Sequence, residues 1–156
     1  MRGRVPRRKA TAFSTTPSAG PRYSPRMTVF LQIEGTAIVD IPSLYAEINR
    51  VFMADEDWQL GPSLDALDDL LYGGYGALAG HETATLVWRD MDRSREALGL
   101  ETTRAWLEDK LRQPGTFNAE TIGRQLDALQ RGEGQTYFDI VMDIFASHPN
   151  VALLPA

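Results

Sequence analysis

Cysteine is absent from the 156 residues, and histidine occurs only at positions 81 and 148. The chain therefore has no disulfide, no thiolate nucleophile, no zinc–thiolate site and no iron–sulfur cluster. Two histidines could contribute to a metal site, but they cannot form a histidine cluster. No apolar run approaches the ~18 residues that a membrane-spanning helix needs. We therefore expect a soluble, cytoplasmic protein with no membrane partner.

The charge is unevenly distributed along the chain. Residues 1–26 contain seven of the 16 basic residues and no acidic residue, whereas the other 130 residues carry nine bases and 21 acids, a net charge of −12. The basic segment is rich in Ser, Thr and Pro and its apolar residues follow no period, so it is predicted to be disordered. We expect a folded domain over 27–156, preceded by a tail or by an over-extended translation start. A cationic tail that binds nucleic acid or a membrane surface is the alternative.

Strand and helix patterns alternate from residue 28 onward. Strands are predicted at 28–33, 83–88 and 151–154, and residues 37–39 are predicted to extend the first strand. Ser43 is the expected N-cap of a first helix that ends near residue 52. Further helices are expected near 63–72, 94–100, 103–112, 119–131 and 137–147. Strands that are joined by helical crossovers favour an α/β fold, in which helices pack against a parallel sheet.

The sequence contains candidate residues for cofactor binding and catalysis, but the elements predicted around them do not fit these functions. Residues 74–79 have the letters GxGxxA of a dinucleotide fingerprint, but here a helix precedes them and a strand follows, which reverses the required order. His81 and His148 lie in predicted loops without metal-ligand spacing, and Ser94 lies among arginines. Because no nucleophile–base pair can be named, we expect no cofactor and do not favour an enzyme.

An acidic helix face is the feature that calls for a partner. Asp65, Asp68 and Asp69 are at i, i+3 and i+4 of the predicted second helix, and the acidic residues 55–57 precede it. Many such faces are simply solvated, and Asp65 is favoured in a first turn by the helix dipole. However, three like charges at this spacing repel, and residues 51–88 contain no lysine or arginine. The residues alone leave three partners open: a divalent metal, a paired-carboxylate active site or a cationic protein surface.

Three motifs between Leu31 and Arg95 resemble the barstar family, whose members are intracellular inhibitors of secreted ribonucleases. They are Ile33-x-Gly35, the LDALxDxL block at 64–71, and Trp88-Arg89 followed by Ser94-Arg95. The resemblance implies a three-stranded parallel sheet flanked by helices, with no catalytic activity. It also implies that residues 101–134 are an inserted helical segment, and residues 137–154 match the family's last helix and strand more loosely.

The resemblance assigns four residues to partner binding. By motif position, Asp65 and Asp69 correspond to the two aspartates of the family's binding helix, and Gly73 corresponds to a glycine at the far end of that helix. Asp143 lies near the position of an acidic contact on the last helix.

Other expected contact positions carry different residues from those of the family. The paired tyrosines of the family's binding loop are replaced by Gln59 and Leu60, with Trp58 beside them. The tryptophan of the binding helix is replaced by Asp68, and its asparagine by Ser63. We therefore expect Trp58, Gln59, Ser63 and Asp68 to contact the partner as well.

The predicted function is inhibition by anion mimicry. The acidic helix and its loop are expected to fill the cationic active site of a ribonuclease or related nuclease toxin, where carboxylates would take the positions of RNA phosphates. The partner is then a basic protein, and no direct nucleic-acid binding is expected. The alternative is a carboxylate-dependent enzyme or a divalent-metal-binding domain that uses Asp65, Asp68 and Asp69.

Overall fold

The computed structural model describes residues 28–113 and 115–156, so the prediction of disorder for residues 1–26 lies outside the described residues. The expected α/β fold with a three-stranded parallel sheet is confirmed. In chain order the elements are β1 (Thr28–Glu34), η2 (Gly35–Ala37), α1 (Ile41–Phe52), α2 (Leu64–Leu71), η3 (Gly76–Leu78), β2 (Thr83–Arg89), α3 (Met91–Ala97), α4 (Leu100–Leu111), α5 (Ala119–Gln130), α6 (Tyr137–Ala146) and β3 (Val151–Pro155). Within this part of the chain, no helix has the length and apolarity to cross a membrane.

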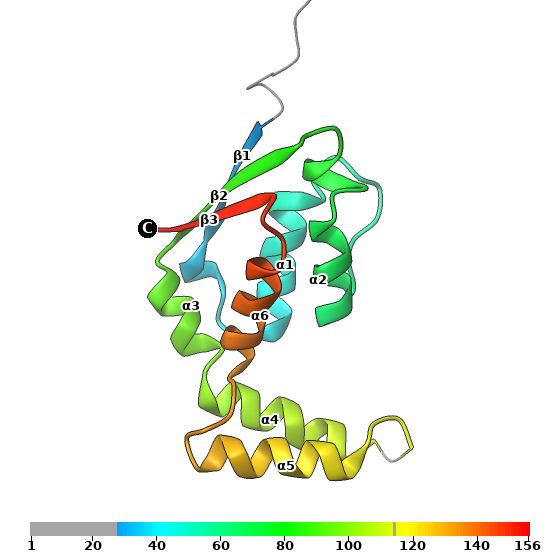
Figure 1. Cartoon of the computed structure of the whole chain (residues 1–156), viewed down its shortest axis with the longest axis vertical. Coiled ribbons are helices and arrows are strands. Elements are labelled where there is room, and N and C mark those ends of the chain that lie inside the picture. Colours follow the sequence, from blue (N-terminus) through cyan, green and yellow to red (C-terminus); the bar gives the residue numbers. More distant parts are fainter. Residues whose placement is uncertain (1–27, 114) are drawn as a thin grey trace, which may run out of the picture.

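The strands lie in the order β1–β2–β3, so β2 is central and each connection crosses over through helices. Side chains alternate between the two faces of the sheet, as strand geometry requires. On the inner face Ile33 is opposite Trp88 and both are buried, whereas Phe30 and Leu154 are exposed on the outer face. Helices α1, α2 and α6 gather on one side of the sheet (Figure 1), and the core lies between them and the sheet.

Two of the family-like motifs meet where β1 and β2 end. The indole N–H of Trp88 donates to the Ser94 hydroxyl oxygen over 3.0 Å, and that hydroxyl donates to the Gly35 carbonyl over 3.2 Å. A Cβ atom at Gly35 would lie 2.2 Å from the Arg89 carbonyl oxygen, so no larger residue fits without a shift. Ser94 is fully buried. These motif residues therefore fix the junction between β1, β2 and α3.

The predicted extension of the first strand at 37–39 is wrong, because the chain forms η2 instead and turns the Ile38 side chain into the core. Ser43 is likewise not the N-cap of α1. The Asp40 carboxylate accepts from the Ser43 backbone N–H over 2.8 Å, and the Ser43 hydroxyl oxygen accepts from the Asp40 backbone N–H over 2.9 Å. This capping box starts α1 at Ile41, and Pro42 fits there because the first turn needs no N–H from it.

Helices α3 and α4 each begin three residues before the expected positions of 94 and 103. The contacts of Thr103 explain why the predicted start of α4 was wrong. Its hydroxyl donates to the Gly99 carbonyl over 2.6 Å and accepts from the Tyr137 backbone N–H over 2.7 Å. A residue that has a suitable side chain for a cap thus lies buried inside α4, where it joins that helix to the start of α6.

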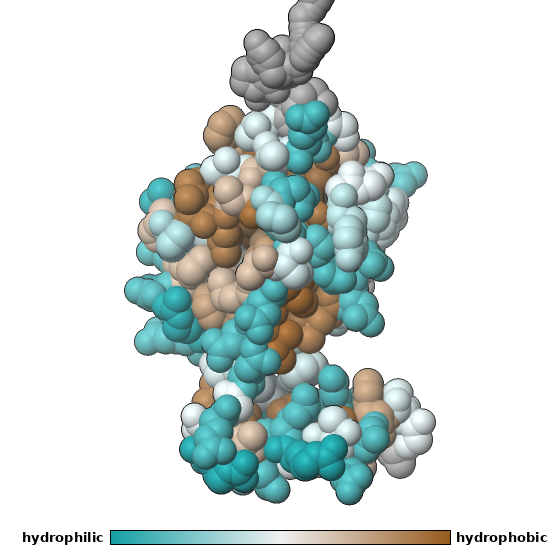
Figure 2. All heavy atoms as spheres, viewed as in Figure 1, coloured by the Kyte–Doolittle hydropathy of each residue, from teal (hydrophilic) through white to brown (hydrophobic). Residues whose placement is uncertain are grey.

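Helices α4 and α5 form an antiparallel hairpin that projects from the rest of the domain (Figure 1). A narrow waist separates the hairpin from the larger part in Figure 2. The hairpin has a small core of its own, formed by Leu107, Ile122 and Leu129. The Trp106 ring packs edge-to-face on Tyr137 with ring centroids 4.8 Å apart, which attaches the hairpin to α6. The segment that was predicted to be inserted is thus helical.

Candidate protein-binding surface

Helix α2 presents two of its three aspartates to solvent. Ser63 is its N-cap, because the hydroxyl oxygen accepts from the Ala66 backbone N–H over 3.0 Å. Leu67, Leu70 and Leu71 are fully buried against the core. Helical spacing then leaves Asp65 and Asp69 exposed, one turn apart on the opposite face. No ion pair between described residues involves either carboxylate.

The third aspartate, Asp68, contacts another part of the domain. Its Oδ1 atom lies 2.6 Å from Nε2 of His148, whose side chain is 4% exposed, while that of Asp68 is 41% exposed. Asn150 binds the same helix, since its side-chain amide donates to the Leu71 carbonyl over 3.0 Å. Residues 148 and 150 thereby hold α2 against the turn that leads from α6 into β3. Sequence reasoning placed His148 in an ordinary turn and did not foresee this contact.

Side-chain hydrogen bonds hold the loop between α1 and α2 in place. The Asn49 side chain accepts from the Leu60 backbone N–H over 2.8 Å and donates to the Leu60 carbonyl over 3.2 Å. Glu56 accepts from the Gly76 backbone N–H over 2.8 Å. The loop is thus fixed at Glu56 and at Leu60, and Trp58 and Gln59 between these anchors are exposed. Glu56 therefore serves the fold, although the sequence suggested that it belongs to a continuous acidic loop.

Aromatic side chains lie near Asp69 and the end of α2. The rings of Trp58 and Tyr75 are 5.0 Å apart between centroids. Burial raises the pKa of Tyr75, and the nearby Asp69 carboxylate raises this pKa further. Tyr72 is 73% exposed, and its ring meets that of His148 edge-to-face at 4.6 Å. Sequence reasoning missed both tyrosines, although the run YGGY directly after an acidic helix was a usable signal, because tyrosine is enriched at protein interfaces.

Gly73 ends α2 in the left-handed region, with φ of +88°. A Cβ atom would have room there, with the nearest atom 3.7 Å away, so the backbone conformation is what favours glycine. This turn directs the chain from the exposed Tyr72 back to Tyr75. Gly73 therefore shapes the end of the surface.

Asp143 lies on α6, which packs beside α2, and its carboxylate accepts from the Gln135 side-chain amide over 2.6 Å. We use the name acidic–aromatic surface for a set of residues on α2 and the segments that flank it. Its members are Trp58, Asp65, Asp69, Tyr72, Gly73 and Tyr75. The predicted contact residues Ser63, Asp68 and Asp143 make the hydrogen bonds described above, and Gln59 is exposed beside Trp58.

The carboxylates of α2 do not converge on one point. Within residues 28–113 and 115–156, no three His, Cys, Asp or Glu side chains are grouped closely enough to hold a metal ion. Asp68 is turned toward His148, whereas Asp65 and Asp69 remain on the exposed face. A divalent ion held by Asp65, Asp68 and Asp69 together would therefore compete with His148 for the Asp68 carboxylate.

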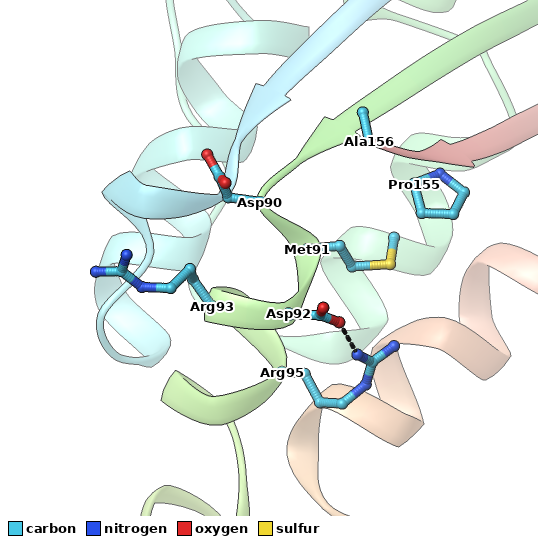
Figure 3. A pocket seen from close by; sticks show the side chains of 7 residues that line it. All are labelled: Asp90, Met91, Asp92, Arg93, Arg95, Pro155 and Ala156. Carbon is cyan, nitrogen blue, oxygen red and sulfur yellow. Dashed lines mark hydrogen bonds and ion pairs between the residues drawn. The ribbon is translucent and has the colours of Figure 1, made fainter.

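A separate hollow of about 480 Å³ lies at the carboxyl ends of the strands, away from α2 (Figure 3). Asp90 borders it with a φ of +50°, and its backbone N–H donates to the Ala156 carbonyl over 3.0 Å. The Asp92 carboxylate and the Arg95 guanidinium pair with each other there. Asp92 and Arg95 thus neutralise each other at the edge of the hollow.

The fold and the surface define a class of protein: a small parallel α/β domain that presents carboxylates and aromatic rings on one helix and its flanking loops. The family described as Barstar (barnase inhibitor) matches residues 28–121, which is more than half of the chain. The chain belongs to the barstar family. The matched region contains the whole acidic–aromatic surface and ends within α5. No curated protein matches the chain.

Proposed function

We propose that this protein is a non-enzymatic inhibitor that binds the cationic active site of a ribonuclease, or of a related nuclease toxin, through the acidic–aromatic surface. Membership of a family of barnase inhibitors supports a nuclease partner. The observation that carries the proposal is the pair of exposed carboxylates on successive turns of α2, Asp65 and Asp69, neither of which forms an ion pair with another residue that the structure describes.

The chemistry follows from what a ribonuclease must do. Its active site holds RNA phosphates with cationic side chains, and a carboxylate can accept the two parallel hydrogen bonds that an arginine offers to a phosphate. Asp65 and Asp69 are therefore the groups that would replace two phosphates. The negative charge of the domain adds long-range attraction toward a basic enzyme, which speeds encounter.

The aromatic residues supply the apolar part of the contact. Trp58, Tyr72 and Tyr75 combine large contact areas with polar tips, and such residues are enriched where binding energy is concentrated. Their position around Asp69 would exclude water from a carboxylate–arginine pair and so strengthen it. The family's usual loop tyrosines are absent from this loop, and we propose that Tyr72 and Tyr75 take over their contribution from the other end of α2.

The test is inhibition of a panel of secreted basic ribonucleases of the barnase type, barnase included. The wild-type chain should inhibit at least one of them stoichiometrically. Asp69→Asn should weaken that inhibition at least ~30-fold, because it removes one charge without changing the shape of the side chain. Glu96→Gln is the matched control, since Glu96 is exposed on α3, away from α2. If no ribonuclease of the panel is inhibited, or if both variants behave alike, the proposal is wrong.

A further inference from the structure

A groove of about 340 Å³ runs between the start of α2 and the α4–α5 hairpin. Leu64 and Asp65 line it from α2, and Trp106, Lys110 and Phe117 line it from the hairpin. Figure 1 shows the turn of the hairpin below the end of α2 where that helix begins. Since Asp65 borders the groove and also belongs to the acidic–aromatic surface, the two are continuous.

On the hairpin side of the groove, the ammonium group of a lysine lies close to two aromatic rings. The Lys110 ammonium lies 3.9 Å from the ring centroid of Trp106 and 5.0 Å from that of Phe117. Burial lowers the pKa of Lys110. No ion pair between described residues includes Lys110. A partly desolvated ammonium of this kind gains most from an incoming carboxylate, and the ring of Phe117, which is 40% exposed, offers apolar area beside it.

We propose that the α4–α5 hairpin is a second binding arm, and that the groove receives a loop of the same nuclease that α2 inhibits. This loop would place an apolar side chain against Phe117 and an acidic side chain on Lys110. The inference rests on the proposed function, because it takes its partner from the continuity of the groove with Asp65. It assigns to the hairpin a role in selecting among nucleases that share a cationic active site but differ in their surface loops.

The arrangement of charge explains why we assign the groove to the same partner as α2. When a basic nuclease docks on Asp65 and Asp69, the loops around its active site come close to the groove. They can enter the groove without a second binding event. An acid on that nuclease would be repelled by α2 and attracted by Lys110, so the pair of sites fixes the orientation of the partner. Like-charge and opposite-charge contacts at the rim of an interface act on specificity in this way.

The experiment uses the full chain and the ribonuclease of the panel that it inhibits most strongly. Phe117→Ala should raise Kd about ten-fold, because truncation of an interface aromatic commonly costs this much. Leu111→Ala is the matched control, since Leu111 is on the same hairpin, is 39% exposed and does not line the groove. It should bind like the wild type. Equal melting temperatures would show that neither change acts through folding.

A substitution of Lys110 gives the sharper test, because the proposal predicts the direction in which Kd changes. Lys110→Met should raise Kd several-fold through faster dissociation, and Lys110→Arg should restore most of the affinity. If the nuclease places no acid there, Lys110→Met makes the inhibitor more acidic and association with a basic enzyme becomes faster instead. Arg124→Met, on the outer side of α5, is the charge-matched control.

Failure of the inference is distinguishable from failure of the proposed function. The hairpin arm is refuted if Asp69→Asn abolishes tight binding while Phe117→Ala and Lys110→Met bind as well as or better than the wild type. It is also refuted if Phe117→Ala alters self-association in sedimentation experiments, because the groove would then join two copies of this chain. If no ribonuclease of the panel binds the wild type, the proposed function and the hairpin arm both fall.

Discussion

Asp68 and Asp69 are adjacent aspartates of α2, and we expect them to have opposite roles. Asp68→Ala removes the partner of the buried His148, whereas Asp69→Ala removes an exposed carboxylate that makes no ion pair with a described residue. A hydrogen bond that includes a charged group contributes about 1.5–3 kcal/mol when both partners are well buried. Because Asp68 is itself 41% exposed, water replaces part of the interaction, and we expect a loss of about 1–2 kcal/mol in the free energy of unfolding.

In a chain of this length such a loss lowers the melting temperature by about 2–8 °C. Asp69→Ala should leave the melting temperature unchanged or raise it slightly, because it relieves repulsion from Asp65 and Asp68. Urea unfolding of the three proteins measures the stability difference at constant temperature. Asp68→Asn, which keeps a polar group within reach of His148, should fall between the wild type and Asp68→Ala.

For the affinity toward a partner we expect the opposite: Asp69→Ala should have the larger effect and Asp68→Ala the smaller one. Asp69→Ala should lose at least ~2 kcal/mol of binding free energy against an inhibited ribonuclease, and Asp68→Ala should lose less than ~1 kcal/mol at a temperature where both are folded. Calorimetric titration measures both values. Two results would refute these roles: a stability of Asp68→Ala equal to that of the wild type, or an equal loss of binding for the two substitutions. In either case Asp68 would not be the carboxylate that stabilises the fold while Asp69 contacts the partner.

Three further predictions concern the scaffold and the encounter. The pKa of the buried Glu47 is held below its ordinary value by the Arg50 guanidinium and by the Glu34 backbone N–H, so Glu47→Gln should cost about 1–2 kcal/mol at pH 7. That stabilisation is present above the ordinary pKa of about 4.3 and is lost as pH falls through the lower folded value, so unfolding midpoints of the two proteins should converge in acid. The hydroxyl oxygens of Tyr45 and Tyr137 are 2.7 Å apart in the core, and the double Phe variant should be about 1 kcal/mol more stable than the two single changes predict, as a double-mutant cycle would measure. Association with an inhibited ribonuclease should slow markedly between roughly 50 and 500 mM salt while dissociation changes little in stopped-flow measurements, and a salt-independent association rate would contradict electrostatic steering.

The order of the elements could be predicted because burial imposes a period on the residues. Alternating apolar residues in β1 and β2 give strands, and the leucines of α2 give a helix with its aspartates outward. Residues 37–39 show the limit of this reasoning, because their β propensity is overridden by packing. Gly35 fits closely against the end of β2, so the chain has to turn before Ile38 enters the core.

The candidate surface was predictable in part for a similar reason. Helical spacing is sufficient to expose Asp65 and Asp69 together, but it treats Asp68 as another member of the same face. The partner of Asp68 is 80 residues away along the chain, and its neighbours carry no local signal of that contact. Contacts between distant segments depend on how the crossovers are packed, and the period of one helix does not contain that information.

His148 and Asn150 hold α2 in place, but they are synthesised long after it. The time at which the surface is fully formed therefore depends on when the chain is completed. Asp65 and Asp69 are translated early, but the helix that carries them is fixed by groups that follow about 80 residues later. A nascent chain that has not yet reached residue 150 contains every residue of the acidic–aromatic surface but not the groups that orient α2. If the surface binds a nuclease as proposed, ribosome-bound intermediates should not yet inhibit it, and inhibition would begin only when chains are completed.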